Sequence, residues 1–370
     1  MEDLEIVAVG DAGTRREFLR LPYRLYRNDP YWVPPLLVAQ KELFDPSKHP
    51  FYRHGAVQRF LARRSGRTVG RIAAILDRNY IEFHGERTGF FGFLEMIEDA
   101  AVARGLLEAA REWLRTQGVE AMRGPMNPST NYECGLLVEG FDSSPVVMMP
   151  YNPPYYVRLL EEAGLQKARD LVAYNVPVNG VRGKRVEGLA VRAASGGMRI
   201  RPIRMAEFDR EAEAIWGIYN SAWERNWGFV PMSREEFFHS AREMKPVLVP
   251  ELALLAENGS RIAGFALALP DINEALRHVG GRLFPFGLFK LLWFKRRIRR
   301  IRVVLLGVLS EYRSAPVAAG LYAALIREGL RLGYREAECS WVLEDNLLMR
   351  RSIESLGGAV YKIYRVYEWK

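Results

Sequence analysis

The hydrophobic pattern of the second half of the chain alternates between two periods, one typical of strands and one typical of helices. Apolar and alternating runs predict strands at 198–204, 251–257, 261–269, 301–309, 336–344 and 359–369. Apolar residues three and four positions apart predict helices at 206–223, 233–244, 315–332 and 346–356. Ser233 followed by Glu236 is the capping-box pattern that begins the second of these helices. This order predicts an α/β fold in which helices flank a mixed central sheet.

The first half of the chain repeats parts of this pattern in the same order. The similar pairs of segments are 61–77 with 255–271, 105–118 with 320–333, and 160–174 with 353–367. Three ordered matches predict two copies of one scaffold, at 1–178 and 198–370, joined by a linker at 179–197 that is rich in glycine and charge. The difference in residue number between the paired segments is not constant. This places insertions between Gly118 and Leu160 and within 272–300, where we expect specificity to reside.

Composition narrows the class of protein. A chain of 370 residues with 49% hydrophobic content can bury the cores of two domains. The acidic N-terminus lacks a secretory pattern, and no apolar run reaches the roughly 18–20 residues that span a bilayer. Two cysteines, Cys134 and Cys339, form neither a metal-ligand cluster nor a disulfide framework. We therefore expect a cytoplasmic protein without a metal.

The positive charge is concentrated in one segment. The net charge is +9, and 290–302 holds seven cations and no acid, so the rest of the chain carries only 9 − 7 = +2. Because the charge is confined to one local patch, it indicates a directed anionic contact rather than a general nucleic-acid coat, and the patch directly follows an aromatic and aliphatic run. Two interpretations stay open: a segment that lies in a membrane interface at the inner membrane face, or a hydrophobic lid whose arginines face water or phosphates. The candidate lipid contacts are Phe286, Phe289, Trp293, Arg296, Arg297, Arg299 and Arg300.

The second half resembles the GNAT superfamily of acyl-CoA-dependent N-acyltransferases. Arg313-x-x-Pro316-x-Ala318 stands where that superfamily has Arg/Gln-x-x-Gly-x-Gly/Ala between a strand and a helix, and Asn346 and the pair Leu356-Gly357 follow in the expected order. The resemblance covers 198–370, and the internal repeat extends it to 1–178, which implies two tandem GNAT-like domains. More loosely, the chain resembles the bacterial ceramide-synthase type of this superfamily, which acylates a long-chain amine.

The resemblance implies acyl-CoA or acetyl-CoA as co-substrate, with its pyrophosphate held by backbone N–H groups at a helix N-terminus. The coenzyme contacts that it implies are Leu309, Arg313, Ala315, Val317, Ala318, Ala319 and Asn346. Pro316 removes one amide, so either the remaining amides suffice or the loop no longer binds phosphate. The aligned turn of the first half carries Glu98 and Asp99, whose charge opposes phosphate, so we expect that domain to be degenerate for CoA and to contribute to the acceptor site.

Acyl transfer to an amine needs a base, and no Ser-His-Asp or Cys-His signature is present, so the amine is expected to attack the thioester directly. Alternation along 336–344 predicts Glu338, Ser340, Val342 and Glu344 on one face of a strand. We take Glu338, Glu344 and Glu133 as candidate catalytic carboxylates, although Glu344 could instead cap the helix that Asn346 opens. The superfamily's tyrosine acid is replaced by Ile353.

The first-half insertion is dense in asparagine, tyrosine and proline. Its candidate acceptor contacts are Asn131, Tyr151, Asn152, Tyr155 and Tyr156, or these residues make turns and fill the seam between halves. The function predicted is an acyl-CoA-dependent N-acyltransferase that acts on an amine, with a lipid amine at the membrane surface as the specific hypothesis. The alternatives are a non-catalytic ligand- or lipid-binding protein and, with less support, a nucleic-acid-binding regulator.

Overall fold

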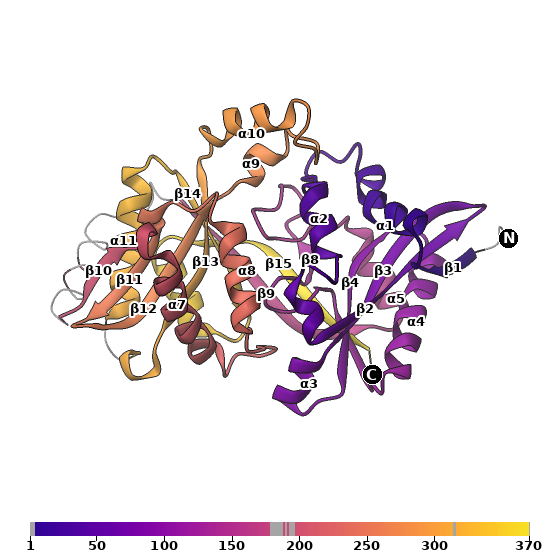
Figure 1. Ribbon diagram of the computed structural model, residues 1–370, viewed down its shortest axis with the longest axis horizontal. Helices are drawn as coiled ribbons and strands as arrows, with labels where there is room; N and C mark the ends of the chain where they lie inside the picture. Colours follow the sequence, from indigo (N-terminus) through magenta and orange to yellow (C-terminus); the bar gives the residue numbers. More distant parts are fainter. Residues whose placement is uncertain (1–3, 178–187, 189–190, 192–196, 314–315, 370) are drawn as a thin grey trace. The chain divides into compact units, whose positions relative to one another are not determined.

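The computed structural model describes residues 4–177, 188, 191, 197–313 and 316–369 (Figure 1). Residue contacts divide the chain into two compact units. Unit 1 comprises Met1–Leu171, Leu276–Leu288 and Lys362–Lys370, and unit 2 comprises Val172–Ala275 and Phe289–Tyr361. Of the predicted linker at 179–197, all but 188, 191 and 197 lie outside the described residues.

Unit 1 is a mixed sheet with helices on both faces. Its elements are β1 (Leu4–Ala8), α1 (Ala12–Leu25), α2 (Leu37–Leu43), β2 (Gly55–Arg64), β3 (Arg67–Asp77), α3 (Arg78–His84), β4 (Thr88–Met96), α4 (Ala100–Thr116), β5 (Ala121–Gly124), β6 (Met126–Asn127), β7 (Glu133–Cys134), β8 (Leu136–Glu139) and α5 (Tyr155–Glu162). The strands follow the order β1-β2-β3-β4-β5, and β4 and β5 are parallel while the other neighbours are antiparallel.

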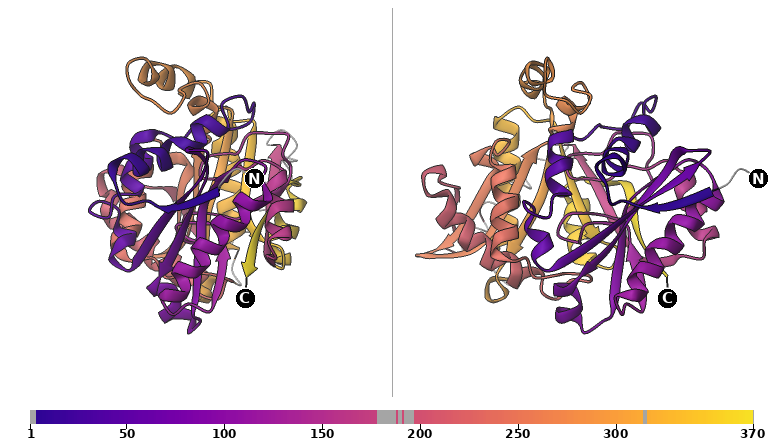
Figure 2. Two further views of the ribbon diagram at one scale, coloured as in Figure 1. Left: turned by 90° about the vertical axis from the view of Figure 1, so that its right-hand side faces the viewer. Right: turned by 45° about the vertical axis from the view of Figure 1, so that its right-hand side comes forward.

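Alternation along β2 and β3 decides which helix covers which face of this sheet. Ala62 and Ile72 pack with Leu106 and Leu107 of α4 in one core, to which α5 also contributes. The intervening side chains point to the other face, where Arg71 donates to the carbonyl of Phe18 in α1. Figure 2 shows these helices and strands from two further sides.

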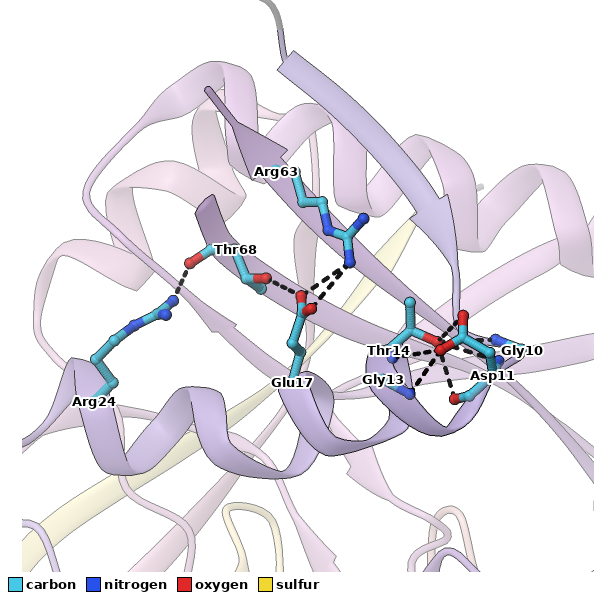
Figure 3. Close-up of polar contacts among 8 residues, drawn as sticks. All are labelled: Gly10, Asp11, Gly13, Thr14, Glu17, Arg24, Arg63 and Thr68. Carbon is cyan, nitrogen blue, oxygen red and sulfur yellow. Dashed lines mark hydrogen bonds and ion pairs between the residues drawn. The ribbon is translucent and has the colours of Figure 1, made fainter. Parts of the chain in front are cut away.

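Polar contacts fix α1 over β2 and β3 (Figure 3). Asp11 caps the helix through the amides of Gly13 and Thr14 in a capping box. Two turns on, the Glu17 carboxylate accepts hydrogen bonds from Arg63 of β2, at 3.0 and 3.1 Å, and from Thr68 of β3. These contacts hold the first half of α1 against β2 and β3.

Unit 2 repeats the same architecture with longer helices on one face. Its elements are β10 (Arg199–Pro202), α7 (Phe208–Trp223), α8 (Arg234–Met244), β11 (Ala253–Asn258), β12 (Arg261–Pro270), α9 (Asn273–Leu276), α10 (Gly287–Lys295), β13 (Arg300–Val308), α11 (Val317–Arg331), β14 (Glu336–Leu343) and α12 (Leu347–Ser355). The last residue of α9 and the first two residues of α10 are counted in unit 1. The strand order is β14-β13-β12-β11-β10, and β13 and β14 are parallel. Leu254 and Ala266 pack under α11, whereas Leu255 and Phe265 pack under α7.

Two long strands contribute residues to both units. The strand β9 (Gln166–Pro177) begins in unit 1 and continues in unit 2, and β15 (Ala359–Trp369) begins in unit 2 and ends in unit 1. The end of β15 pairs antiparallel with β5, from Tyr367 with Gly124 to Trp369 with Met122. The last strand of the chain therefore completes the sheet of the first unit.

The predicted α/β fold class is confirmed, and each strand and helix predicted for the second half is present. Ser233 and Glu236 form the predicted capping box at the start of α8. Most boundaries differ from the prediction by one or two residues, and two of these differences arise at prolines. The chain at 250–252 is a 3₁₀ turn begun by Pro250, so β11 starts at Ala253, and α11 starts at Val317 because Pro316 occupies the N-cap.

We expect Asp170→Asn to lower the free energy of unfolding by about 1–3 kcal/mol at neutral pH, since Asp170 accepts two hydrogen bonds from Arg365 of β15, at 2.8 and 3.1 Å. Burial disfavours the charged carboxylate, but the bonds from Arg365 and Lys167 outweigh it and lower the pKa of Asp170. The contribution is therefore present above the unfolded-state pKa of about 3.9 and is lost as the pH falls through the lower folded-state value.

The measurement for Asp170 is urea unfolding at several pH values. The exposed Asp142→Asn variant serves as the control and should match wild type throughout. A stability difference for Asp170→Asn that persists unchanged at low pH would contradict the expected role of the ion pair.

Candidate functional site

The start of α11 offers backbone donors that no described side chain caps. Pro316 is the N-cap residue, and the first bond of the helix runs from the Gly320 amide to the Pro316 carbonyl at 3.0 Å. The amides of Val317, Ala318 and Ala319 come before that bond, and they receive no side-chain cap from the part of the chain that the structure describes. Ala318 and Ala319 are small and half-buried, so an anion can approach these amides closely.

The start of α4, the corresponding helix of unit 1, is closed by its own acid. The Asp99 carboxylate accepts hydrogen bonds from the amides of Ala101 at 2.9 Å and Val102 at 3.1 Å. It also forms an ion pair with Arg64, with 2.7 Å between Nη1 and Oδ2. A second anion at this helix start would have to displace Asp99.

The other described residues that we expect to contact the coenzyme form hydrogen bonds with nearby backbone groups. Leu309 follows β13, and its amide donates to the carbonyl of Ala263 at 3.0 Å. Arg313 donates to the carbonyl of Ala222 at the end of α7, also at 3.0 Å. Asn346 caps α12 by accepting a hydrogen bond from the Met349 amide at 3.1 Å. Ala315 lies outside the described residues.

An apolar pocket of unit 2 lies between α11, α12 and the paired parts of β13 and β14. Its lining includes Val303, Tyr322, Leu325, Cys339 and Ile353. Burial raises the pKa of the Cys339 thiol far above its ordinary value, so this cysteine stays a neutral thiol.

Glu338 of β14 is fully buried beside a cation. Its carboxylate lies 3.5 Å from Nε of Arg302 on β13, and the two side chains are 0% and 2% exposed. Burial raises the pKa of Glu338, while Arg302, Ser340 and Tyr361 favour the carboxylate and limit that rise. A carboxyl group with a raised pKa is a stronger base than an ordinary glutamate.

The predicted alternation along β14 is wrong beyond Cys339. Val342, expected on the face of Glu338, packs with Cys339 and Ile353 in one apolar cluster. The register pairs between β13 and β14 run only from Arg300 with Glu336 to Val303 with Cys339. Past that point the pairing with β13 ends and the alternation is interrupted, so Glu344 cannot be placed on the face of Glu338 by counting residues.

The remaining carboxylates and the acceptor candidates are divided between the two units, with Glu344 in unit 2 and the others in unit 1. Glu344 of unit 2 is half-buried before α12, and Glu133 of unit 1 is half-buried in the β6–β7 hairpin opposite Asn127. Asn152 is 4% exposed, and its side-chain amide clamps Leu137 through both the amide and the carbonyl of that residue. Asn131 is half-buried in the turn between β6 and β7.

The tyrosines of the first-half insertion bond to the α1 side and to the end of β4. The Tyr151 hydroxyl donates to the Asp29 carboxylate at 2.6 Å, and the Tyr155 hydroxyl donates to the Met96 carbonyl at 2.7 Å. Tyr156 is 0% exposed and accepts a hydrogen bond from the Met96 amide at 2.6 Å. Tyr151 and Tyr155 are half-buried and keep part of their surface open.

Unit 1 contains a buried polar cluster that the sequence analysis missed. Arg71 of β3 lies 3.6 Å from the carboxylate of Glu95 on β4, and the hydroxyl of Tyr26 donates to the same carboxylate. Tyr26 and Tyr156 are joined by a hydrogen bond of 3.1 Å between their hydroxyls. Burial raises the pKa of Glu95, against the effect of Arg71 and the two tyrosines. The available signal was a single charged residue inside each of two neighbouring apolar strands.

The candidate lipid contacts lie in and around α10. Phe286 precedes the helix, Phe289 and Trp293 are on it, and Arg296, Arg297 and Arg299 follow it before Arg300 begins β13. In the described part of the chain, no helix combines the length and the apolar character needed to cross a membrane. The same residues contain no group of three or more His, Cys, Asp or Glu side chains placed to hold a metal ion.

Comparison with known proteins finds two relatives of nearly equal length. The bacterial ceramide synthase of Caulobacter vibrioides is 36% identical over 373 residues, which cover 99% of this chain and 97% of that protein. Protein YghO of Escherichia coli is 36% identical over 359 residues, 95% of this chain and 92% of that protein. No protein-family model matches the chain.

Among solved structures, a tandem GNAT protein from the clavulanic acid biosynthesis pathway aligns with a TM-score of 0.59. The alignment covers 99% of this chain and 98% of that one at 16% identity. At this identity, the likeness supports the fold alone, and that fold is a tandem GNAT fold.

We expect Glu95→Gln to destabilise the protein by about 3 kcal/mol, because the change leaves the Arg71 guanidinium buried without its carboxylate. Glu98→Gln, three residues further along, is the matched control, since Glu98 pairs with Arg158 at the exposed surface and should change stability by less than about 1 kcal/mol. Thermal and urea unfolding measure both variants. Equal stability of the two variants would contradict a structural role for the Arg71–Glu95 pair.

Proposed function

The chain belongs to the family of tandem GNAT acyltransferases that includes the bacterial ceramide synthase of Caulobacter vibrioides, and on that premise we propose that it transfers an acyl group from acyl-CoA to a long-chain, lipid-like amine. The observation that carries the proposal is the difference between two helix starts. The amides at the start of α11 receive no cap from any side chain that the structure describes, whereas Asp99 caps those of α4.

The donor binds to unit 2. The pyrophosphate of acyl-CoA accepts hydrogen bonds from the amides of Val317, Ala318 and Ala319, and the helix dipole adds attraction. Pro316 removes one donor, yet as the N-cap it leaves the three following amides in place. The apolar pocket between α11 and α12 supports binding of an apolar part of the donor. Unit 1 does not bind CoA, because Asp99 and its charge occupy the equivalent position.

The reaction is a direct attack of the amine on the thioester. A base removes a proton from the acceptor ammonium, the amine nitrogen forms a bond to the acyl carbon, the carbon–sulfur bond breaks, and the CoA thiolate takes a proton. The neutral, buried Cys339 supports attack without an acyl-cysteine intermediate. Among the candidate bases, the raised pKa favours Glu338, whereas accessibility favours Glu344 and Glu133.

The acceptor amine contacts unit 1 through the half-buried Asn131, Tyr151 and Tyr155. Asn152 and Tyr156 act indirectly, since their side chains are buried and hold Leu137 and Met96 in position. A long-chain amine partitions into the bilayer, so we place the reaction at the cytoplasmic face of a membrane, with the protein bound peripherally. The name of the Caulobacter relative supports this class of acceptor.

A non-catalytic lipid-binding protein is the second candidate. It is favoured by Pro316 in the donor loop and by Ile353 at the position of the superfamily's tyrosine. The two functions are separated by the response to acyl-CoA alone, before any amine is added.

Acetyl-CoA and a long-chain acyl-CoA should each be titrated against the protein while its melting temperature is followed. We expect the long-chain donor to stabilise wild type, by about 2.7 kcal/mol at 100 times its dissociation constant, and Ala318→Asp to abolish the shift by placing a carboxylate among the phosphate-binding amides. The matched control is Ala101→Asp, the same change at the same helical position of α4, which should leave the shift intact.

If neither donor changes the melting temperature of wild type, the result would favour the non-catalytic lipid-binding function. Equal shifts in wild type and Ala318→Asp would instead remove the assignment of the donor to α11.

Glu338→Gln should slow turnover by about 100-fold or more and spare donor binding, as expected for loss of a general base. A base must be deprotonated to act, so kcat/KM should rise with pH through the raised pKa of Glu338, and this limb of the profile should vanish in the variant. Glu344→Gln and Glu133→Gln are measured in parallel. Loss of the acidic limb in either of those variants, with a normal profile for Glu338→Gln, would reassign the base.

A further inference from the structure

The helix α10 turns its apolar side outward. Phe289, Leu292 and Trp293 lie three and four residues apart, hence on one face, and are 72%, 56% and 60% exposed. The opposite face carries the buried Gly287 and the half-buried Leu291. A helix at a protein–water surface normally presents polar residues outward, so this arrangement is the reverse of what water favours.

Two more aromatic side chains extend the exposed area on the N-terminal side of the helix. Phe284 and Phe286 are 78% and 70% exposed. Together with Phe289, Leu292 and Trp293 they form what we term the α10 surface, five large apolar side chains that are each more than half exposed. Clustered exposure of this kind marks a binding surface, because isolated apolar side chains at a surface are common but contiguous groups are not.

Exposed cations border the α10 surface, and no acidic side chain in the described part of the chain forms an ion pair with them. Lys290, Arg296, Arg297 and Arg299 are exposed, and the sequence has no aspartate or glutamate between Glu274 and Glu311. The Glu274 carboxylate is engaged by the backbone amides of Arg299 and Arg300, at 3.1 and 3.0 Å. Arg297 stacks over Trp293 with 5.2 Å between its guanidinium carbon and the ring centroid.

Arg300 is not part of this border. Its guanidinium forms an ion pair with Glu336 of β14, with 2.9 Å between Nη2 and Oε2, and the pair neutralises its charge. The sequence alone could not separate Arg300 from its three neighbouring arginines.

We infer that the α10 surface docks on the anionic surface of a phospholipid bilayer. The aromatic and leucine side chains enter the interfacial region, and the surrounding cations contact lipid phosphates, as in other segments that lie in the membrane plane. The helix has nine residues, so it lies on the membrane and does not cross it. A nucleic acid would match the cations and leave the outward Phe, Leu and Trp side chains in water.

This inference rests on the proposed function for its purpose, which is to bring the enzyme to an amine that resides in the bilayer. The docking itself needs no acyl transfer and is measured separately. We expect wild type to sediment with vesicles of phosphatidylcholine and phosphatidylglycerol, and to bind at least about 10-fold less tightly to phosphatidylcholine alone or at high salt.

Two combined variants test the two parts of the surface. Phe289→Ser, Leu292→Ser and Trp293→Ser together should remove binding to anionic vesicles, and so should Arg296→Glu, Arg297→Glu and Arg299→Glu together. The control carries the same three charge reversals at the exposed Arg67, Arg104 and Arg225, and it should bind like wild type. Melting temperatures show whether each variant is folded.

Wild type that stays in the supernatant with anionic vesicles would overturn the inference, as would unchanged sedimentation of both surface variants. A homodimer that becomes monomeric when the three apolar residues are replaced, without vesicle binding, would assign the α10 surface to a second copy of the chain and also overturn it. Acyl transfer by wild type to a long-chain amine in detergent micelles is scored independently, so its absence counts against the proposed function and not against docking.

Discussion

The first amides of a helix must find acceptors, and the candidate donor site follows from the way the two units meet this requirement. In α4 the requirement is met within the chain, because Asp99 accepts from two amides and is itself neutralised by Arg64. In α11 a proline stands at the N-cap and cannot offer a side-chain acceptor. The duplicated scaffold thus has one helix start that is capped by its own carboxylate and one that receives no cap from a described side chain, where we propose that the phosphates of the donor bind.

The two units also differ in the surroundings of their buried ion pairs. Unit 1 places the hydroxyls of Tyr26 and Tyr156 on one oxygen of the Glu95 carboxylate, Oε2, while Arg71 lies 3.6 Å from the other, Oε1. Unit 2 places Glu338 against Arg302 in an almost fully buried setting. Desolvation raises the pKa of both carboxyls, yet only Glu338 lies in the unit that we assign to the donor.

The two insertions differ in what their side chains contact. The insertion of the first half supplies tyrosine hydroxyls to Asp29 and Met96, and so ties its own loops to the sheet of unit 1. The insertion of the second half does the opposite in α10, where large apolar groups and arginines stay exposed. Because the first insertion is largely tied down by hydrogen bonds and the second is exposed, we propose different partners for them, the acceptor amine for the first and a membrane surface for the second.

Periodicity in the sequence determined the order and type of the elements, the α8 capping box and the tandem architecture, because each depends on residues within a few positions of one another or on an internal repeat. The tertiary structure alone decided that β15 completes the sheet of unit 1, that Val342 leaves the face of Glu338, that Arg71 meets Glu95, and that Glu336 neutralises Arg300. These outcomes depend on which distant strands become neighbours, and local propensity carries no information about such pairs.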